Sequence, residues 1–81
     1  MFWQVVYDYK RKLSCIEGIT QDDTFFTNNV YDLQQKGAPI RCQTPSLKNY
    51  TQKNLLIDEL NRMGYKYITE SILDYYKSEL G

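Results

Sequence analysis

The chain has 81 residues, of which ten are basic and ten are acidic, so its formal net charge at pH 7 is zero. A chain of this length can bury one small core, and we therefore expect residues 1–81 to form a single domain. The balanced charge gives no overall field that would draw the molecule to nucleic acid or to an anionic membrane, and no apolar run reaches the length of a membrane span. We expect a cytoplasmic protein that has no membrane partner.

Two alternating runs at the start of the chain predict an antiparallel β-hairpin. Residues 2–9, FWQVVYDY, place one set of side chains on the face that we predict to be the core face, namely Trp3, Val5, Tyr7 and Tyr9. Residues 13–19, LSCIEGI, form the second strand, and its apolar face would contain Leu13, Cys15 and Ile19. Gly18 indicates a β-bulge near the end of this strand. The charged turn between the strands lacks the Asn-Gly or Asp-Gly pair that fixes a tight hairpin.

A helix and a short strand follow the hairpin. Asp22 or Asp23 would cap the helix, because a carboxylate there accepts backbone N–H bonds and faces the positive end of the helix dipole. Helical spacing predicts an apolar side made of Phe26, Val30 and Leu33, with Phe25 beside them. Gly37 and Pro39 end the helix. Residues 39–44 then form a short strand centred on Ile40 and Cys42.

Residues 51–69, TQKNLLIDELNRMGYKYIT, predict a helix, a stop and a strand. Thr51 would cap the helix, and Gly64 can adopt the left-handed conformation that ends it. The apolar stripe of this helix consists of Leu56, Leu60 and Met63, with Leu55 and Ile57 at its margins. Residues 65–68 give the strand, and Thr69 or Ser71 would cap a last helix. The apolar side of that helix contains Ile72, Leu73, Tyr76 and Leu80.

The predicted order is therefore β-β-α-β-α-β-α, which indicates a small α+β domain with a mixed sheet. The helix between the third and fourth strands predicts that these two strands are parallel neighbours, because such connections are usually right-handed crossovers. The hairpin at residues 2–19 would extend the sheet in the antiparallel sense. We expect the helices to lie mainly on one face, since so short a chain can hardly cover both.

The sequence offers little equipment for catalysis. Histidine is absent, which removes the commonest general base and metal ligand. Cys15 and Cys42 form no CxxC pair and are typical of small buried hydrophobes, and a disulfide would require their strands to be neighbours. Glu70 and Asp74 stand one helical turn apart, as acidic residues near a helix start often do. We therefore expect no enzyme activity, no cofactor and no metal site, and a small carboxylate-dependent enzyme is kept as a further alternative.

The chain contains eight tyrosines, and this high number is the feature of the composition that says most about function. Tyr7, Tyr9 and Tyr76 fit the predicted apolar faces. The other five are candidates for an exposed partner-binding surface, namely Tyr31, Tyr50, Tyr65, Tyr67 and Tyr75. Tyrosine is enriched in binding surfaces because it brings a large rigid ring with a polar tip at a small cost in entropy.

These observations favour a non-catalytic module that binds another protein and inhibits or adapts it. Small accessory proteins of phages and mobile elements have this size and style, which is an analogy and not a family match. The alternative is a nucleic-acid-binding module that uses the basic turn, Lys10, Arg11 and Lys12, with nearby aromatics stacking on bases. A small-ligand binder is a further alternative. An uncovered sheet edge or aromatic face would be covered most simply by a two-fold homodimer.

Overall fold

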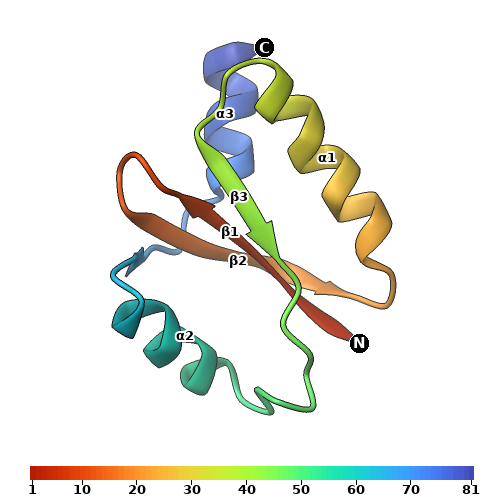
Figure 1. The fold of residues 1–81 in the computed structure, drawn as a ribbon, viewed down its shortest axis with the longest axis vertical. Helices are drawn as coiled ribbons and strands as arrows, with labels where there is room; N and C mark the ends of the chain where they lie inside the picture. The colour runs from red at the N-terminus through yellow and green to blue at the C-terminus, as the bar shows by residue number, and fades with distance from the viewer.

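The structure is a computed structural model that describes the backbone of residues 1–81 and the side chains of all residues except 23–26. Its elements follow one another in the predicted order (Figure 1), which confirms the predicted fold class of a small mixed sheet with helices. The elements are β1 (Phe2–Asp8), β2 (Leu13–Thr20), α1 (Asp23–Gln35), β3 (Ile40–Gln43), α2 (Lys53–Arg62), β4 (Lys66–Tyr67) and α3 (Ile72–Leu80).

The four strands lie in the order β3-β1-β2-β4. β1 pairs antiparallel with β2, as predicted for the hairpin, and also with β3, while β2 pairs in parallel with β4. The prediction that β3 and β4 are parallel neighbours is wrong, because the whole hairpin lies between them. The connection through α2 instead carries the chain across the full width of β1 and β2, from one edge of the sheet to the other.

A β-bulge interrupts the hairpin in β2. Gln4 lies opposite Gly18 and Val5 lies opposite Ile16, so Glu17 is the extra residue, and the bulge predicted at Gly18 is confirmed. An extra residue reverses the alternation of side chains beyond it. Ile19 therefore lies opposite Trp3 and is 47% exposed, and the prediction that it shares the face of Leu13 and Cys15 is wrong.

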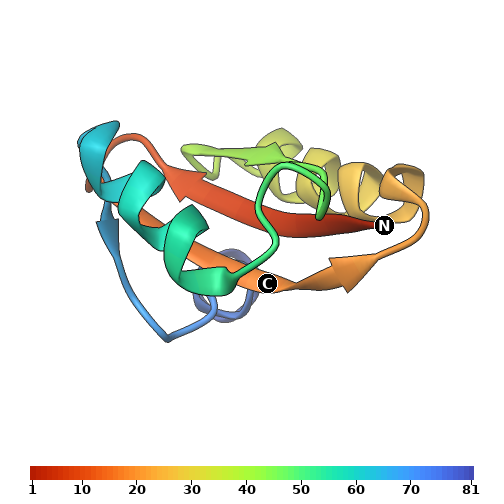
Figure 2. The ribbon, with the colours of Figure 1, turned by 90° about the horizontal axis from the view of Figure 1, so that it is seen from below.

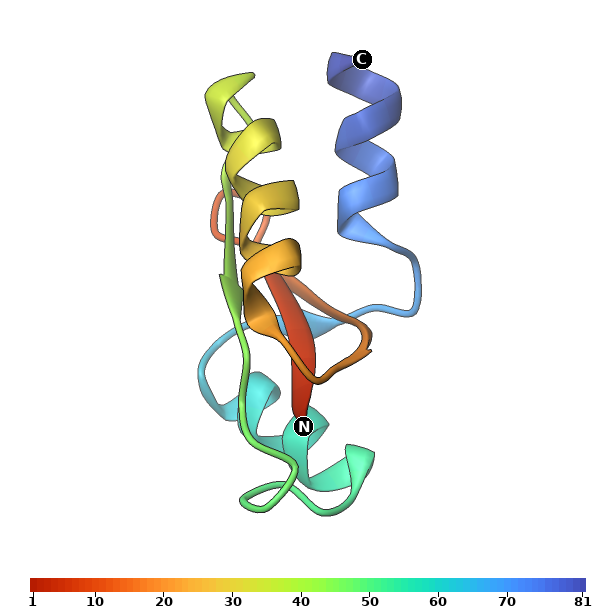
Figure 3. The ribbon, with the colours of Figure 1, turned by 90° about the vertical axis from the view of Figure 1, so that its right-hand side faces the viewer.

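Side chains are buried on both faces of the sheet. One core joins Val6 and Cys15 to α1 and α3, through Val30, Leu33, Ile72, Leu73 and Tyr76. The other joins the predicted face of β1 to α2, through Trp3, Val5, Tyr7, Leu56 and Leu60. Figure 1 and Figure 3 show α1 and α3 together on one side of the hairpin and α2 on the other. Two of the three helices thus share a face, as predicted, and the short helix α2 lies on the other face, where it packs against the large rings of β1.

The connection from β3 to α2 contributes to the second core. Figure 2 shows this connection passing the start of β1 before it enters α2. Phe2 forms an isolated bridge with Ser46, and the indole Nε1 of Trp3 donates a hydrogen bond to the carbonyl oxygen of Tyr50 at 2.8 Å. The indole nitrogen is therefore satisfied where the ring is buried.

The helix ends follow local sequence signals with some exceptions. Ser71 caps α3 as predicted, since its Oγ accepts a hydrogen bond from the backbone N–H of Asp74 at 3.0 Å. Gly64 follows α2 with a φ of 93°, in the left-handed region predicted for it. The cap of α2 is Gln52, so the prediction of Thr51 is one residue early. The predictions for the side chains of Asp23, Phe25 and Phe26 lie outside the described residues.

Two predicted core residues at element ends are exposed. Met63, the C-cap of α2, is 46% exposed. The buried residues of this helix are Leu56 and Leu60, so the predicted apolar stripe is buried over two of its three positions. Leu80 at the end of α3 is also exposed, whereas Ile72, Leu73 and Tyr76 are buried as predicted.

Candidate functional site

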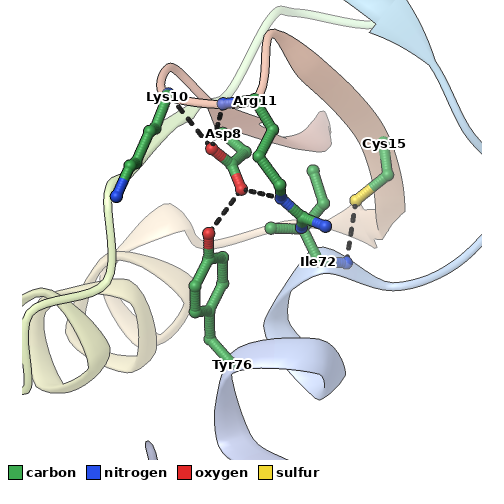
Figure 4. Close-up of polar contacts among 6 residues, drawn as sticks. All are labelled: Asp8, Lys10, Arg11, Cys15, Ile72 and Tyr76. Atoms are coloured by element: carbon green, nitrogen blue, oxygen red, sulfur yellow. Dashed lines mark hydrogen bonds and ion pairs between the residues drawn. The ribbon is translucent and has the colours of Figure 1, made fainter. Parts of the chain in front are cut away.

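A buried carboxylate closes the hairpin turn. Asp8, the last residue of β1, is fully buried. Its Oδ1 accepts hydrogen bonds from the backbone N–H groups of Lys10 at 3.1 Å and Arg11 at 2.9 Å. Its Oδ2 accepts from Nε of Arg11 at 2.6 Å and from the hydroxyl of Tyr76 at 2.5 Å (Figure 4). An aspartate side chain that binds backbone groups two and three residues on replaces the missing Asn-Gly signal, and this is how the turn is held.

The ionisation of this cluster follows from its geometry. Burial is the largest influence on the pKa of the Asp8 carboxyl and raises it, but the hydrogen bonds from Tyr76 and Arg11 together outweigh burial and leave the pKa below its ordinary value. Burial, with the bond to Asp8, raises the pKa of the Tyr76 hydroxyl to about 12. The bond to Asp8 also raises the pKa of Arg11. Asp8 is thus a buried anion with a cation and three further donors around it.

A second polar cluster joins the β2 bulge to the start of α3. Glu17 accepts a hydrogen bond from the hydroxyl of Ser71, with 2.8 Å to each carboxylate oxygen, and from the backbone N–H of Leu73 at 3.4 Å. The thiol of Cys15 donates to Glu17 at 3.1 Å and accepts from the backbone N–H of Ile72 at 3.4 Å. The carboxylate therefore satisfies the positive end of the α3 dipole from within the molecule.

The two cysteines pack as small apolar residues, as predicted. Cys15 is buried, and burial raises the pKa of its thiol to about 12, which keeps it protonated and unreactive. Cys42 is half-buried against the same core. Both lie opposite Val6, on either side of β1, so their Cα atoms are two strand spacings apart, roughly 10 Å. That separation is too large for a disulfide.

A groove opens on the α2 face, beside β3. We call it the tyrosine groove; it has a volume of about 290 Å³ and is lined by Tyr7, Tyr9, Arg41, Cys42, Gln43, Met63 and Tyr65. It exists because α2 contacts β4 at one edge of the sheet and leaves the β3 edge of the same face uncovered. Tyr9 was predicted to lie in the core, but it follows the last residue of β1 and is 45% exposed at this groove.

A hydrogen bond and a ring contact join the residues at the floor of the tyrosine groove, and two cations lie over its rings. The hydroxyl of Tyr7 donates to Oε1 of Gln43 at 2.5 Å, and the Tyr7 ring lies 4.7 Å from the ring of Tyr65. Burial raises the pKa of Tyr7 to about 12, so its hydroxyl stays a donor. The Arg41 guanidinium lies 5.6 Å from the ring of Tyr9, and Nζ of Lys12, which lies outside the lining, is 5.7 Å from the ring of Tyr65. Two cations thus lie over two aromatic rings of one groove.

A second groove opens on the opposite face, between the hairpin turn and the start of α3. We call it the Arg11 groove; it has a volume of about 300 Å³ and is lined by Arg11, Leu13, Ile68, Glu70, Ser71, Ile72 and Tyr75. Its guanidinium is fixed, since Arg11 is bound to Asp8 through Nε and its Cζ lies 4.1 Å from the centre of the Tyr75 ring. Sequence reasoning singled out Arg11 and Tyr75 but gave no reason to place them together.

The five tyrosines predicted to form a partner surface are spread over both faces. Tyr31 on α1 and Tyr75 on α3 are exposed, as the helical spacing predicted. Tyr50, Tyr65 and Tyr67 are half-buried against the core that contains Leu56 and Leu60. Tyr65 enters the tyrosine groove, Tyr75 enters the Arg11 groove, and Tyr50 borders a broad depression of about 610 Å³ with Leu55 and Arg62. Arg41, Gln43 and Met63 were not among the predicted site residues, because nothing in their local pattern connects them.

The side chains of the basic turn point to both faces of the sheet. Arg11 points toward α3 and is paired with Asp8 through Nε, whereas Lys12 lies over Tyr65 on the other face. Lys12 has a φ of 58°, and this left-handed conformation at the end of the turn accompanies the divergence of the two side chains. The three consecutive cations therefore do not present one continuous patch.

The described side chains contain no metal-ligand cluster. The side chains of Glu70 and Asp74 are exposed, and among residues with described side chains no three cysteines or carboxylates are grouped as metal ligands. No helix in the described chain has the length and apolar character needed to cross a membrane.

The comparisons with known proteins add no further constraint. No family model matches the sequence, and no match was found among curated proteins or among solved structures.

Proposed function

We propose that this protein is a non-catalytic module that binds a partner protein through the tyrosine groove. The observation that supports this most directly is the composition of the groove. Tyr9, Arg41, Met63 and Tyr65 come from three separate parts of the chain and line one concavity. Tyrosine, arginine and methionine are the residue types enriched in protein interfaces, and tyrosine and arginine dominate their binding energy.

The exposure of the groove residues is consistent with this role. Tyr9 and Met63 are 45% and 46% exposed, an arrangement that leaves apolar surface in water. Beneath them, the bond from Tyr7 to Gln43 and the ring of Tyr65 hold the floor in place. A floor that is already ordered loses little conformational freedom when a partner binds, so more of the contact energy appears as affinity.

The charge of the groove indicates an acidic partner surface. Among the described side chains the ion pairs are Arg11 with Asp8 and Arg62 with Glu59, so neither Arg41 nor Lys12 takes part in one. A partner that places a carboxylate beside Arg41 and an apolar side chain beside Met63 would satisfy both features. Inhibition or adaptation of that partner would follow from covering its surface.

Affinity capture from the native cells tests the groove if three variants are compared with the wild type. Tyr9→Ala and Arg41→Glu change the groove, and Tyr31→Ala removes a somewhat more exposed ring on α1, on the other face of the sheet. The captured amount of a true partner should fall roughly 10-fold or more with both groove variants and should stay the same with the control. The purified candidate must then bind the wild type directly, and its affinities for the wild type and the three variants must rank as the captured amounts do.

Capture that is equal for all four proteins would refute the groove as the binding site. Loss with Tyr31→Ala alone would move the interface to α1. Light scattering across a dilution series identifies the case in which the partner is a second copy of this chain, because the groove variants would then abolish a dimer formed by the wild type.

Single-stranded nucleic acid is the second candidate ligand, and the positions of Lys12 and Arg41 favour it. Both cations lie over tyrosine rings of the same groove, and proteins that bind single strands combine cations with stacked aromatic rings. Fluorescence anisotropy with labelled oligonucleotides at increasing salt distinguishes this case. Affinity that falls steeply and linearly with the logarithm of salt concentration would support nucleic acid over a protein partner.

A further inference from the structure

The Arg11 groove has its own chemistry, which the tyrosine groove on the opposite face does not use. We propose that the Arg11 groove is a second binding site and that its ligand is a free α-amino acid with an apolar side chain. Its described lining residues combine three features that such a ligand matches: an apolar floor, a fixed cation and a separate anion.

The floor is apolar and of suitable size. Leu13, Ile68, Ile72 and the ring of Tyr75 form most of the lining, and the volume is about 300 Å³. Small-molecule sites begin at roughly this volume and combine apolar walls with a few placed polar groups. A leucine or phenylalanine side chain would replace water against these four residues.

The cation is held in position before any ligand arrives. Arg11 is anchored on one side by the fully buried Asp8, at 2.6 Å from Nε, and on the other by the Tyr75 ring at 4.1 Å. Because the anchor uses Nε, the two terminal nitrogens can still donate to a carboxylate in the two-pronged geometry that arginine favours (Figure 4). A fixed guanidinium loses little side-chain entropy on binding.

A carboxylate in the lining of the same groove selects for a second charge. Glu70 lines the same groove and is exposed, while the ion pair of Arg11 is made with Asp8. A simple carboxylate would meet attraction from Arg11 and repulsion from Glu70. A ligand that carries a carboxylate, an ammonium and an apolar side chain is attracted by both charges and by the floor.

Amide shifts in nuclear magnetic resonance spectra of the full chain test the proposal. The probes are L-leucine, L-phenylalanine, 4-methylpentanoate, which lacks the ammonium, and 3-methylbutylamine, which lacks the carboxylate. We expect both amino acids to shift amides in residues 11–13 and 68–75, and each single-charge probe to bind about 10-fold more weakly or worse.

Two variants assign the charges to their residues. Glu70→Gln should weaken binding of both amino acids about 10-fold and leave 4-methylpentanoate bound as well as before or better. Asp58→Asn removes an exposed carboxylate from α2, on the other face, and should change nothing. Arg11→Lys keeps the charge but cannot reach both Asp8 and the ligand in the same way, so it should also weaken amino-acid binding.

The proposal is overturned if neither amino acid shifts the groove amides up to its solubility limit. It is overturned equally if 4-methylpentanoate binds as tightly as leucine and Glu70→Gln has no effect, because the ammonium would then have no partner. Shifts confined to the tyrosine groove would also overturn it. None of these outcomes depends on the partner-protein proposal.

Discussion

The two faces of the sheet are buried by different means. On the face covered by α1 and α3, buried carboxylate, thiol and hydroxyl groups are tied together around Asp8 and Glu17. On the face covered by α2 alone, large rings do most of the covering, and their polar atoms bind at the margin, as Trp3 does with Tyr50 and Tyr7 with Gln43. Among the described side chains, no buried polar atom on either face lacks a partner.

This difference explains where the tyrosine groove lies. Two helices can enclose a polar network, and a network that is fully paired fixes the relative positions of the elements it joins. One helix with a loop can bury rings but covers only part of the sheet, so the rings near the other edge remain at the surface. Changes of pH and the loss of single hydrogen bonds on the polar face should therefore lower the free energy of unfolding. On the aromatic face, the free energy of unfolding should fall when a buried side chain is replaced by a smaller one.

The largest expected effect is a cavity on the aromatic face. Leu60→Ala removes a fully buried side chain of α2, and the loss of burial together with the cavity should lower the free energy of unfolding by about 3 kcal/mol. Leu55→Ala, on the same helix but exposed, should change it by less than about 0.5 kcal/mol. Urea unfolding measures the free energy of unfolding of both variants. A similar loss in Leu60→Ala and Leu55→Ala would show that α2 does not bury this face.

The next largest effect is the loss of the buried anion on the polar face. Asp8→Asn keeps the size of the side chain but removes the charge paired with Arg11, and we expect a loss of about 2 kcal/mol near neutral pH. Because the folded pKa of Asp8 is lowered, the charged form stabilises the fold above the unfolded pKa of about 3.9, and this contribution is lost as the pH falls through the folded pKa.

The difference between wild type and Asp8→Asn should therefore shrink as the pH is lowered below about 4. Urea unfolding across acidic pH values measures it. A difference that stays constant with pH would show that Asp8 is not the anion that this geometry describes.

A smaller effect is expected from one donor of the same network. Tyr76→Phe removes the hydroxyl that binds Asp8 but keeps the ring, so the expected loss is about 1 kcal/mol. Combining it with Asp8→Asn gives a double-mutant cycle. The loss of stability in the double variant should be smaller than the sum of the losses in the two single variants. Strict additivity would mean that the two groups do not interact.

The smallest effect on stability is expected at the tyrosine groove. Tyr9→Ala removes an exposed ring, and it should change the free energy of unfolding by less than about 0.5 kcal/mol. The same variant is expected to reduce partner capture roughly 10-fold. Calorimetry on the pure variant separates the two results, and a marked loss of stability would reclassify Tyr9 as a core residue.

The order of the elements could be predicted because its signals are local. Gly64 stops α2, Ser71 caps α3, and the spacing of Leu56 and Leu60 marks the buried side of α2 within a few residues. The register change in β2 was also visible, in Gly18. These features depend on backbone geometry and periodicity, which neighbouring residues determine.

The neighbours within the sheet and the composition of the grooves depend on contacts between distant residues. No local pattern shows that β3 pairs with β1, although that pairing brings Arg41 opposite Tyr7 and builds the tyrosine groove. The burial of Asp8 depends in the same way on Tyr76. An aspartate at a strand end, just before a charged turn, is a signal for a closed turn, but it does not reveal which helix will cover it.

The hydrogen bond between Asp8 and Tyr76 spans 68 residues, and it links the first strand to the last helix. Peeling α3 away would expose the core of that face and leave a carboxylate of the hairpin without one of its donors, so fraying at this end of the chain costs more than the loss of a few helical hydrogen bonds. Amide protons of the hairpin and of α3 should accordingly exchange with solvent in a single concerted opening, while those near α2 are free to open on their own.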